Sequence, residues 1–374
     1  MTVIDFCADL LRTDSTPGNE RRAIERAAAE MERLHYDDVT IDEHGNLVGR
    51  VGPADGSPVL LLDGHMDTIP LHAEAWTRDP LGAETEDGIM YGLGASDMKG
   101  PVAAIVHGGG RAKASGSPLR GCLYVVASIA EEMMEGATLD RSFRDLPIDY
   151  CVIAEATALK IATAQRGRAK VEVDVHGQSV HAANASLGVN AAEIAAEVVR
   201  GARELPPGSH PLLGKRDVNL IDIHSEPYPS VNTIPNRCLV RFDVRFLPGE
   251  TKEGLLGAFR GLLPADAAAD IRYYRARWET YVGESFEVDE FAASWETPLD
   301  HPLVTAAVEV TGAALTAYGF CTNGSYFAGV RGIPTIGFGP ALPEDAHTPD
   351  EKIPIEHLDK AANAYRDITL ALIS

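Results

Sequence analysis

Unbroken apolar runs that end at polar residues recur in the first half of the chain. One run, Val59-Leu60-Leu61-Leu62, is followed by Asp63, and similar runs occupy residues 121–130 and 149–154. Runs of this kind are typical of strands that are buried on both faces of a parallel sheet. Open α/β sheets bind their ligands beyond the carboxyl ends of the strands, so the residues that follow each run are candidates for a functional site.

A different pattern begins after Gln165. Four segments are expected to form strands with one polar face: 170–176, 220–224, 238–246 and 271–278. Helices are predicted at about 189–205 and 252–263. The expected result is a small antiparallel sheet covered by two helices, which forms a separate inserted domain.

After residue 302 the pattern of helices and buried strands returns. The spacing predicts a helix over 303–318, a buried strand near 333–340 and a final helix over 355–373. The loop 341–354, between this strand and the final helix, carries His347.

Two predictions near the amino terminus concern helix ends and glycines. A helix is predicted from Glu20 to Leu34, with Asn19 as its cap. A second helix begins near Pro101 and contains Gly108-Gly109-Gly110, each of which costs about 0.8 to 1 kcal/mol relative to alanine. This helix must therefore either pack closely against a neighbour or end early.

Length and charge limit the possible classes of protein. The 374 residues exceed the usual size of one hydrophobic core, which predicts two domains. With 33 Lys and Arg against 55 Asp and Glu, the net charge of −22 repels nucleic acid and anionic membranes. No apolar stretch approaches the roughly 20 residues of a membrane helix, and Asp5 and Asp9 replace the basic start of a signal peptide. A cytoplasmic protein is expected, without nucleic-acid or membrane partners.

The cysteines do not predict a metal site or a disulfide framework. There are five, an odd number, and they are scattered without a CxxC pair. Most of them are expected to be small buried apolar residues.

Candidate chemistry lies at the predicted strand ends. If the backbone stays extended, His65 and Asp67 project to the same side of their strand. Asp97 precedes Pro101 and lies near the positive end of a predicted helix, which keeps its carboxylate ionised. The full set of candidates is His65, Asp67, Asp97, Glu131, Glu132, Glu155 and His347.

These residue types predict a metal site with nitrogen and oxygen ligands. Two histidines and several carboxylates suit zinc, cobalt or manganese, and five of the seven residues are enough to hold two ions. Such a pair of ions, about 3.5 to 4 Å apart, activates water and polarises a carbonyl group. Each residue alone has a simpler interpretation, as a hydrogen-bonded structural histidine, a helix cap or a solvated acid. The joint occurrence of all seven therefore carries the hypothesis.

Five motifs together resemble a known family. GHMDT, GLGASDMKG, the paired AEE, AEAT and the late AHTPDE are similar, in order and spacing, to the acetylornithine deacetylase and succinyl-diaminopimelate desuccinylase family of co-catalytic metallopeptidases and amide hydrolases. The resemblance implies an α/β catalytic domain with a phosphorylase/hydrolase-like, mostly parallel sheet flanked by helices. It also implies an inserted α+β, ferredoxin-like lid and dimerisation domain at 165–282, with the catalytic domain at 1–164 and 283–374.

The resemblance also implies roles for the candidate residues. Its five metal ligands are His65 and Glu155 for one ion, Glu132 and His347 for the other, and Asp97 as the bridge. Asp67 is expected to orient His65, and Glu131 to act as the general base. The cofactor is then two divalent ions per chain, with zinc expected and cobalt or manganese as alternatives.

Further residues are expected to bind the substrate. In the lid, His181 resembles a histidine that stabilises the oxyanion, often in the partner subunit of a homodimer, and its other interpretation is a turn residue. Asn232 and Arg245 resemble lid residues that bind a substrate carboxylate, for which a guanidinium is well suited. Asn323 and Gly324 are expected either to shape the pocket or to form a simple turn.

The predicted function is hydrolysis of an amide in a small N-acylated amino acid or a related carboxylate-bearing compound. The alternatives are a carboxypeptidase or dipeptidase, a hydrolase of N-carbamoyl ureides, and a catalytically silent binding or assembly protein. Glu155 resembles the deacylases and carboxypeptidases, because the aminopeptidases and dipeptidases tend to have aspartate at that position. Met133 and Met134 are apolar where polar residues are common, which favours a less polar acyl group.

Overall fold

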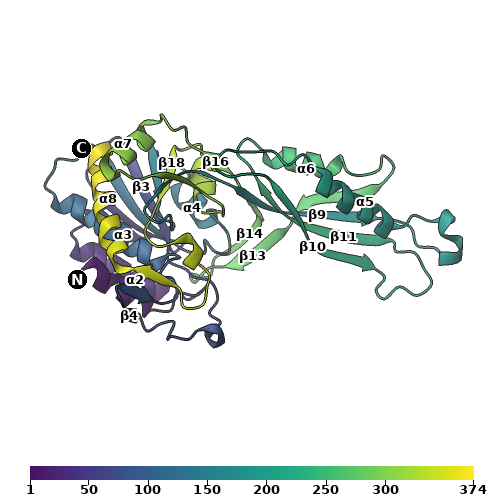
Figure 1. The fold of residues 1–374 in the computed structure, drawn as a ribbon, viewed down its shortest axis with the longest axis horizontal. Coiled ribbons are helices and arrows are strands. Elements are labelled where there is room, and N and C mark those ends of the chain that lie inside the picture. Colours follow the sequence, from purple (N-terminus) through teal and green to yellow (C-terminus); the bar gives the residue numbers. More distant parts are fainter. The chain divides into compact units, whose positions relative to one another are not determined.

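The chain folds into two units, which we describe separately (Figure 1). The computed structural model covers residues 1–374. Unit 1 comprises Met1–Gln165, Arg277–Phe286 and Glu296–Ser374, and unit 2 comprises Arg166–Ala276 and Glu287–Trp295. None of the helices is both long enough and apolar enough to cross a lipid bilayer.

A nine-stranded sheet forms the centre of unit 1. Its middle strand is β3 (Val59–His65), which pairs in parallel with β6 (Cys122–Ser128) and with β7 (Tyr150–Ile153). On the far side of β7, the strand β18 (Thr335–Phe338) is also parallel. The order is β1-β2-β6-β3-β7-β18-β8-β16 with β17 beside β8, where the other strands are β1 (Asp38–Ile41), β2 (Leu47–Val51), β8 (Ile161–Gln165), β16 (Trp295–Glu296) and β17 (Leu315–Tyr318). The predicted parallel sheet of buried strands is confirmed.

Helices cover both faces of this sheet. Leu60 and Leu62 of β3 belong to a core on one face, whereas Val59 and Leu61 belong to a core on the other face, as the period of two requires. The first core includes α1 (Val3–Leu11), α2 (Arg21–Arg33), α3 (Lys99–Ala114), α7 (Pro302–Thr311) and α8 (Ile355–Ile373). The second core includes α4 (Ala137–Phe143) and a short helical segment, Ser325–Val330. α3 and α8 lie side by side in Figure 1.

Close packing explains the three glycines of α3. A Cβ atom at Gly108 would lie 2.6 Å from Cβ of Tyr365, and one at Gly110 would lie 2.9 Å from Cδ1 of Leu34. The helix continues through all three glycines to Ala114, so the alternative of an early end is wrong. Their missing side chains allow α3 to approach α8 and the end of α2 closely.

Two other helix predictions are corrected. The helix expected over 303–318 ends at Thr311, because Gly312 adopts a left-handed conformation (φ 65°) that ends the helix, and Leu315–Tyr318 forms β17 instead. Asn19 does not cap α2, since Glu20 occupies that position without a side-chain hydrogen bond, and Asn19 donates to Thr16 Oγ1.

Unit 1 also contains a small sheet of β4 (Thr85–Glu86), β5 (Ile89–Tyr91) and β19 (Lys352–Pro354).

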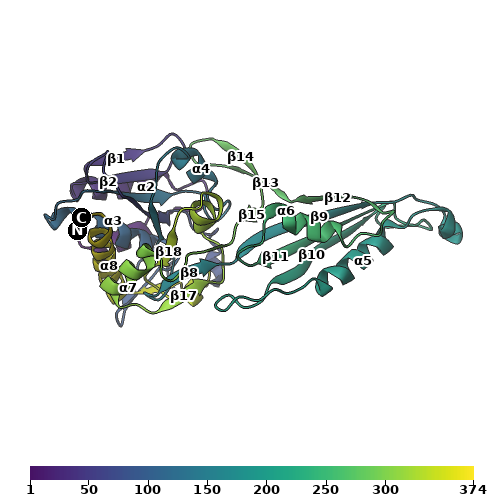
Figure 2. The same cartoon turned by 90° about the horizontal axis from the view of Figure 1, so that it is seen from above.

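Unit 2 is an α+β fold with a ferredoxin-like order of elements. The chain runs through β9 (Gly167–His176), α5 (Ala191–Glu204), β10 (Asp217–Glu226), β11 (Arg237–Phe246), α6 (Lys252–Arg260) and β12 (Ala268–Tyr273). The sheet order is β10-β11-β9-β12, with antiparallel neighbours and the short β15 (Phe291–Ala292) beside β9. Both helices pack on one face of the sheet, as Figure 2 shows. β13 (Arg275–Glu279) and β14 (Ser285–Asp289), whose residues are divided between unit 1 and unit 2, form a separate two-stranded sheet.

Candidate metal centre

The carboxylate of Asp97 lies between two histidines. Its Oδ1 is 3.0 Å from Nε2 of His65, and its Oδ2 is 3.1 Å from Nε2 of His347. The two oxygens of one carboxylate therefore each face a different imidazole. This is the arrangement that a carboxylate bridging two metal ions requires.

Each histidine has a further carboxylate of its own. Nε2 of His65 is 3.2 Å from Oε1 of Glu155 and 3.8 Å from Oε2 of Glu131. Nε2 of His347 is 2.8 Å from Oε1 of Glu132. The structure thus brings together all the candidates that the sequence placed at strand ends.

Neighbouring strand ends explain this convergence. His65 is the last residue of β3, Glu155 follows β7, and the glutamate pair follows β6. These three strands are adjacent and parallel, so their carboxyl ends meet at one edge of the sheet. Asp97 stands just before α3, and His347 lies in the loop between β18 and α8.

The chain turns sharply before the glutamate pair. The apolar run 121–130 predicts an extended backbone up to Ala130. Ala130 instead has a left-handed conformation (φ 57°), so this part of the prediction is wrong. The carboxylate of Asp67 holds the turn, because its Oδ1 accepts from the N–H of Glu131 at 3.1 Å and its Oδ2 from the N–H of Glu132 at 3.0 Å. The two glutamates still reach different partners, His65 and His347 respectively.

Asp67 also contacts His65, chiefly through its main chain. Nδ1 of His65 lies 2.8 Å from the carbonyl oxygen of Asp67, while the Asp67 carboxylate is 3.6 Å away. A proton on Nδ1 satisfies this contact and leaves the lone pair of Nε2 directed toward Asp97 and Glu155. That tautomer is the one that a histidine ligand needs.

Uncompensated negative charge perturbs the whole centre. Burial opposes a charged His65, but Glu131, Asp97 and Glu155 raise its pKa well above the usual value. Hydrogen bonds to Asp97 and Glu132 raise the pKa of His347 to about 10. Burial raises the pKa of Glu155 to about 7. In the absence of another cation, the cluster must take up protons to reduce its charge.

Metal ions fit this cluster. Two sets of three residues, His65–Asp97–Glu132 and His65–Glu131–Glu155, have ligand atoms that all lie within 4.8 Å of one another. Oε1 of Glu131 is buried and accepts no hydrogen bond. Cations that replace the protons of the cluster would satisfy the same oxygen and nitrogen donors. The chemistry of the donor set therefore suits divalent ions with nitrogen and oxygen ligands.

Glu351 and Asn323 make buried hydrogen bonds near the centre, and the sequence did not predict these contacts. Glu351 is buried and accepts hydrogen bonds from the N–H groups of Gly94, Ser96 and Asp97. Asn323 donates to Oδ2 of Asp63 at 2.9 Å and accepts from the N–H of Gly136 at 2.9 Å. Because its amide is fully engaged within the protein, these contacts favour a structural role for Asn323 over substrate binding.

Gly324 also has a structural setting. Its N–H donates to Oγ1 of Thr322 at 3.0 Å, and the residue begins the Ser325–Val330 segment. The loop leads into this short helical segment, which precedes β18, and a role of Gly324 in shaping the pocket stays a prediction.

The three predicted lid residues all lie in unit 2. His181 is exposed, and its Nδ1 accepts from the N–H of Ala183 at 3.1 Å. Asn232 is exposed in a loop with a left-handed backbone (φ 56°). Arg245 is on β11, where its Nε donates to Oδ1 of Asp243 at 2.8 Å. Their roles in substrate binding stay predictions.

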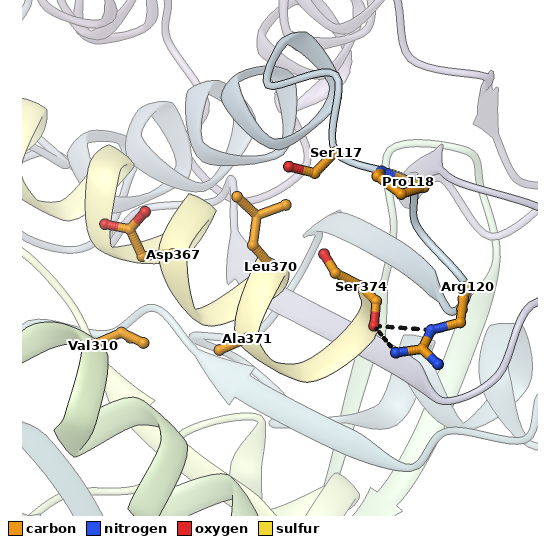
Figure 3. A pocket seen from close by; sticks show the side chains of 8 residues that line it. All are labelled: Ser117, Pro118, Arg120, Val310, Asp367, Leu370, Ala371 and Ser374. Carbon is orange, nitrogen blue, oxygen red and sulfur yellow. Dashed lines mark hydrogen bonds between the residues drawn. The ribbon is translucent and has the colours of Figure 1, made fainter.

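A surface hollow lies apart from these residues. It has a volume of about 880 Å³ and is formed by the loop after α3 together with α7 and α8 (Figure 3). Arg120 at its edge donates to the carbonyl oxygen of Ser374. None of the predicted site residues lines it.

Known proteins resemble this chain along almost its whole length. Acetylornithine deacetylase of Vibrio vulnificus (strain CMCP6) is 32% identical over 357 residues, which cover 91% of this chain and 89% of that protein. The uncharacterized protein YgeY of Escherichia coli (strain K12) is 29% identical over 381 residues, with 99% of this chain and 94% of that protein covered.

A solved structure shares the fold. The YxeP protein of Bacillus subtilis, described as a dinuclear metal binding peptidase from the M20 family, superposes with a TM-score of 0.71 at 13% identity. The match covers 99% of this chain and 97% of that chain.

The family assignment rests on a match that covers most of the chain and does not depend on single motifs. Residues 61–371 match the family described as peptidase family M20/M25/M40. The match includes every residue of the centre, from His65 to His347, and it confirms the resemblance to the deacetylases. The chain therefore belongs to peptidase family M20/M25/M40 and is a metal-dependent hydrolase.

Proposed function

We propose that this hydrolase cleaves the amide bond of a small N-acylated amino acid, with two divalent ions at the candidate centre. The observation that carries the proposal is Asp97, whose two oxygens face His65 and His347 at 3.0 and 3.1 Å. Glu155 and Glu132 supply a separate carboxylate on each side. Zinc is the proposed metal, and cobalt and manganese suit the same donors.

Two ions held by His65, Glu155, Asp97, Glu132 and His347 would supply Lewis-acid chemistry for the amide carbonyl and for water at neutral pH. The protein residues position the reactants and transfer the proton. Glu131 takes a proton from the attacking water and delivers it to the leaving amine nitrogen. Two features support this assignment: Oε1 of Glu131 has no hydrogen-bond partner, and Asp67 fixes the Glu131 backbone.

We further propose that unit 2 binds the substrate and joins two chains into a homodimer. The edge strand β10 supports a dimer contact, since Leu220, Ile221 and Ile223 are exposed along it. His181 would stabilise the oxyanion, while Asn232 and Arg245 would bind the substrate carboxylate. For that purpose Arg245 must exchange its present contact with Asp243 for the ligand.

Amide hydrolysis of an acylated amino acid is favoured over the other candidates by one relative. The Vibrio vulnificus protein, 32% identical, is named for deacetylation. A substrate panel tests the proposal, with N-acetyl, N-succinyl and N-carbamoyl amino acids beside dipeptides, each assayed with zinc, cobalt and manganese. Cleavage of N-acyl amino acids is the expected result. Cleavage of dipeptides alone or ureides alone would replace the proposal with a peptidase or a ureide hydrolase.

Subunit mixing tests the proposed dimer site. If His181 acts on the partner's centre, chains with His181→Ala mixed with chains carrying Glu131→Ala form some hybrid sites with both residues intact. Partial recovery of activity is expected. No recovery, with subunit exchange verified by mass spectrometry of labelled chains, would contradict action across a dimer.

A further inference from the structure

Glu351 holds the backbone of the loop that carries Asp97. Its Oε1 accepts from the N–H groups of Ser96 and Asp97, both at 2.7 Å, and its Oε2 accepts from the N–H of Gly94 at 2.9 Å. The residue is only 2% exposed. Burial removes water as a competitor for these three hydrogen bonds.

Other contacts bind the same two segments together. The carbonyl oxygen of Glu351 accepts from the N–H of Gly92 at 2.9 Å, and that of Leu342 accepts from Oγ of Ser96 at 3.0 Å. Gly94 has a left-handed conformation (φ 86°), and a Cβ atom there would lie 2.9 Å from Cγ2 of Thr68. The loop conformation therefore depends on glycine at this position and on the Glu351 carboxylate.

The same segment also carries His347, four residues before Glu351. His347 Nε2 is 3.1 Å from Oδ2 of Asp97, so the segment contacts Asp97 from two directions. His347 faces the Asp97 carboxylate, whereas Glu351 holds the Asp97 backbone. Glu351 thus binds the backbone of Asp97 and lies on the same segment as His347.

The neighbouring residue Asp350 also accepts hydrogen bonds from backbone N–H groups, so such bonds alone do not indicate a role at the metal centre. Asp350 accepts from the N–H groups of Thr77 and Arg78, at 2.9 and 3.1 Å. That turn carries none of the residues of the centre. The two adjacent carboxylates therefore make similar bonds to two different loops, and they form a matched pair for an experiment.

We propose that Glu351 is a positioning residue for the metal centre. Glu351 sets Asp97 opposite His347 and thereby determines the affinity for the second metal ion, which is the ion assigned to Glu132, His347 and the bridging Asp97. The inference rests on the proposed two-metal centre. Residues that orient metal ligands typically change affinity by about 10- to 100-fold when they are replaced. Glu351→Gln keeps the size of the side chain but presents an amide N–H₂ to a backbone N–H donor, so one contact becomes repulsive.

The test compares Glu351→Gln with Asp350→Asn in the full chain. Calorimetric titration of metal-free protein with zinc measures the affinity of each ion, and the Tm of the metal-free protein measures folding. We expect Glu351→Gln to weaken binding of the second ion by about 10- to 100-fold. Asp350→Asn should leave both affinities unchanged. Turnover of Glu351→Gln should recover at saturating zinc.

Unchanged metal affinity in Glu351→Gln would overturn the inference, even with a lower Tm, because that result indicates a purely structural role. If Glu351→Gln does not fold, Glu351→Asp replaces it, since the shorter carboxylate keeps the charge. An intermediate loss of affinity is then expected, and wild-type affinity would again overturn the inference. Failure of the proposed function is recognised separately, by a substrate panel without N-acyl cleavage or by wild-type protein that binds no metal.

Discussion

Two clusters of charged residues in this protein are built on opposite principles. On the open face of the unit 2 sheet, every buried acid of β9 faces arginine: Asp174 receives two hydrogen bonds from Arg237, at 2.7 and 2.8 Å. Glu172 lies 2.7 Å from Arg241 and 2.9 Å from Arg272. In unit 1, the carboxylates at the strand ends converge on two imidazoles and no arginine or lysine.

The pKa values reflect this difference. Hydrogen bonds from Arg237 lower the pKa of Asp174, whereas burial raises the pKa of Glu155 to about 7. Acids that are paired within the protein stabilise the fold and need nothing further. Acids that converge without such partners destabilise it until a cation binds, which is why the unit 1 cluster indicates function and the unit 2 cluster does not.

The sharpest test of this comparison replaces one acid from each cluster by its amide. Glu131→Gln should lower kcat by about 10²- to 10⁴-fold, because the proposed general base is lost. It should leave the metal content unchanged, since the proposed ligands remain. Glu172→Gln in unit 2 should leave kcat unchanged. Steady-state kinetics with the best substrate of the panel, together with elemental analysis, measure both quantities.

Near-normal turnover in Glu131→Gln would remove this residue from its proposed role. Loss of both ions in the same variant would instead assign Glu131 as a metal ligand. The metal content is measured separately because Oε2 of Glu131 lies only 3.8 Å from Nε2 of His65.

Removal of the metal ions should produce the next largest effect. The free energy of unfolding is expected to fall by about 3 to 4 kcal/mol relative to protein at 100 to 1,000 times the dissociation constant. Urea unfolding with and without a chelator measures this change. Glu172→Gln should show the same difference, because its acid is not part of the centre. Equal stability with and without metal would contradict the view that the centre is strained by its own charge.

The sequence predicted the parts of this centre that follow from strand ends. Periodicity located β3, β6 and β7, and the parallel arrangement then implied that His65, Glu155 and the glutamate pair meet. His347 lies far along the chain in an irregular loop; the sequence placed it among the candidates, but only the family resemblance gave it a specific ligand role. The sequence named Asn323 only as a pocket or turn residue and did not name Glu351, because the hydrogen bonds of both join residues more than 180 positions apart and no local pattern reports such contacts.

The errors have equally local causes. The apolar spacing of 303–318 fits a helix throughout, but Gly312 and the strand partner supplied by β8 favour a helix followed by a strand. The left-handed turn at Ala130 could not be predicted, since alanine rarely adopts that conformation and the Asp67 carboxylate holds it in place.

Two buried glutamates at opposite ends of α2 extend the comparison to stability. Glu20 is fully buried, and burial raises its pKa from 4.5 to about 7. Neither of its oxygens accepts a hydrogen bond of ordinary geometry, and it forms no ion pair. Glu30 is also buried, but its carboxylate contacts Arg33 at 2.6 and 2.7 Å. Replacement by glutamine should therefore act in opposite directions.

The sign for Glu20 follows from its raised pKa. Between pH 4.5 and about 7 the folded state keeps a proton that the unfolded state has released, so this group makes stability fall as pH rises. Glu20→Gln should match wild type near pH 4.5 and exceed it by about 1 to 3 kcal/mol above pH 7. Glu30→Gln should be less stable than wild type by about 1 kcal/mol. Urea unfolding from pH 5 to 8 distinguishes them, and a pH-independent gain for Glu20→Gln would contradict the pKa argument.

The smallest expected effect concerns the compensated cluster of unit 2. Arg237→Lys keeps the positive charge but replaces a two-pronged contact with Asp174 by a single ammonium. Because the Arg237 side chain is 38% exposed, water screens the pair, and a loss of only about 0.5 kcal/mol is expected. Arg241→Lys serves as the matched control, since its side chain is 24% exposed and contacts Glu172 on the same strand. Both variants should keep their metal content and kcat. A loss of several kcal/mol in Arg237→Lys, without a similar loss in Arg241→Lys, would mean that the Arg237–Asp174 pair is shielded from water in solution. The acids of unit 2 and those of the metal centre would then differ in whether a protein cation pairs with them, and not in how far they are buried.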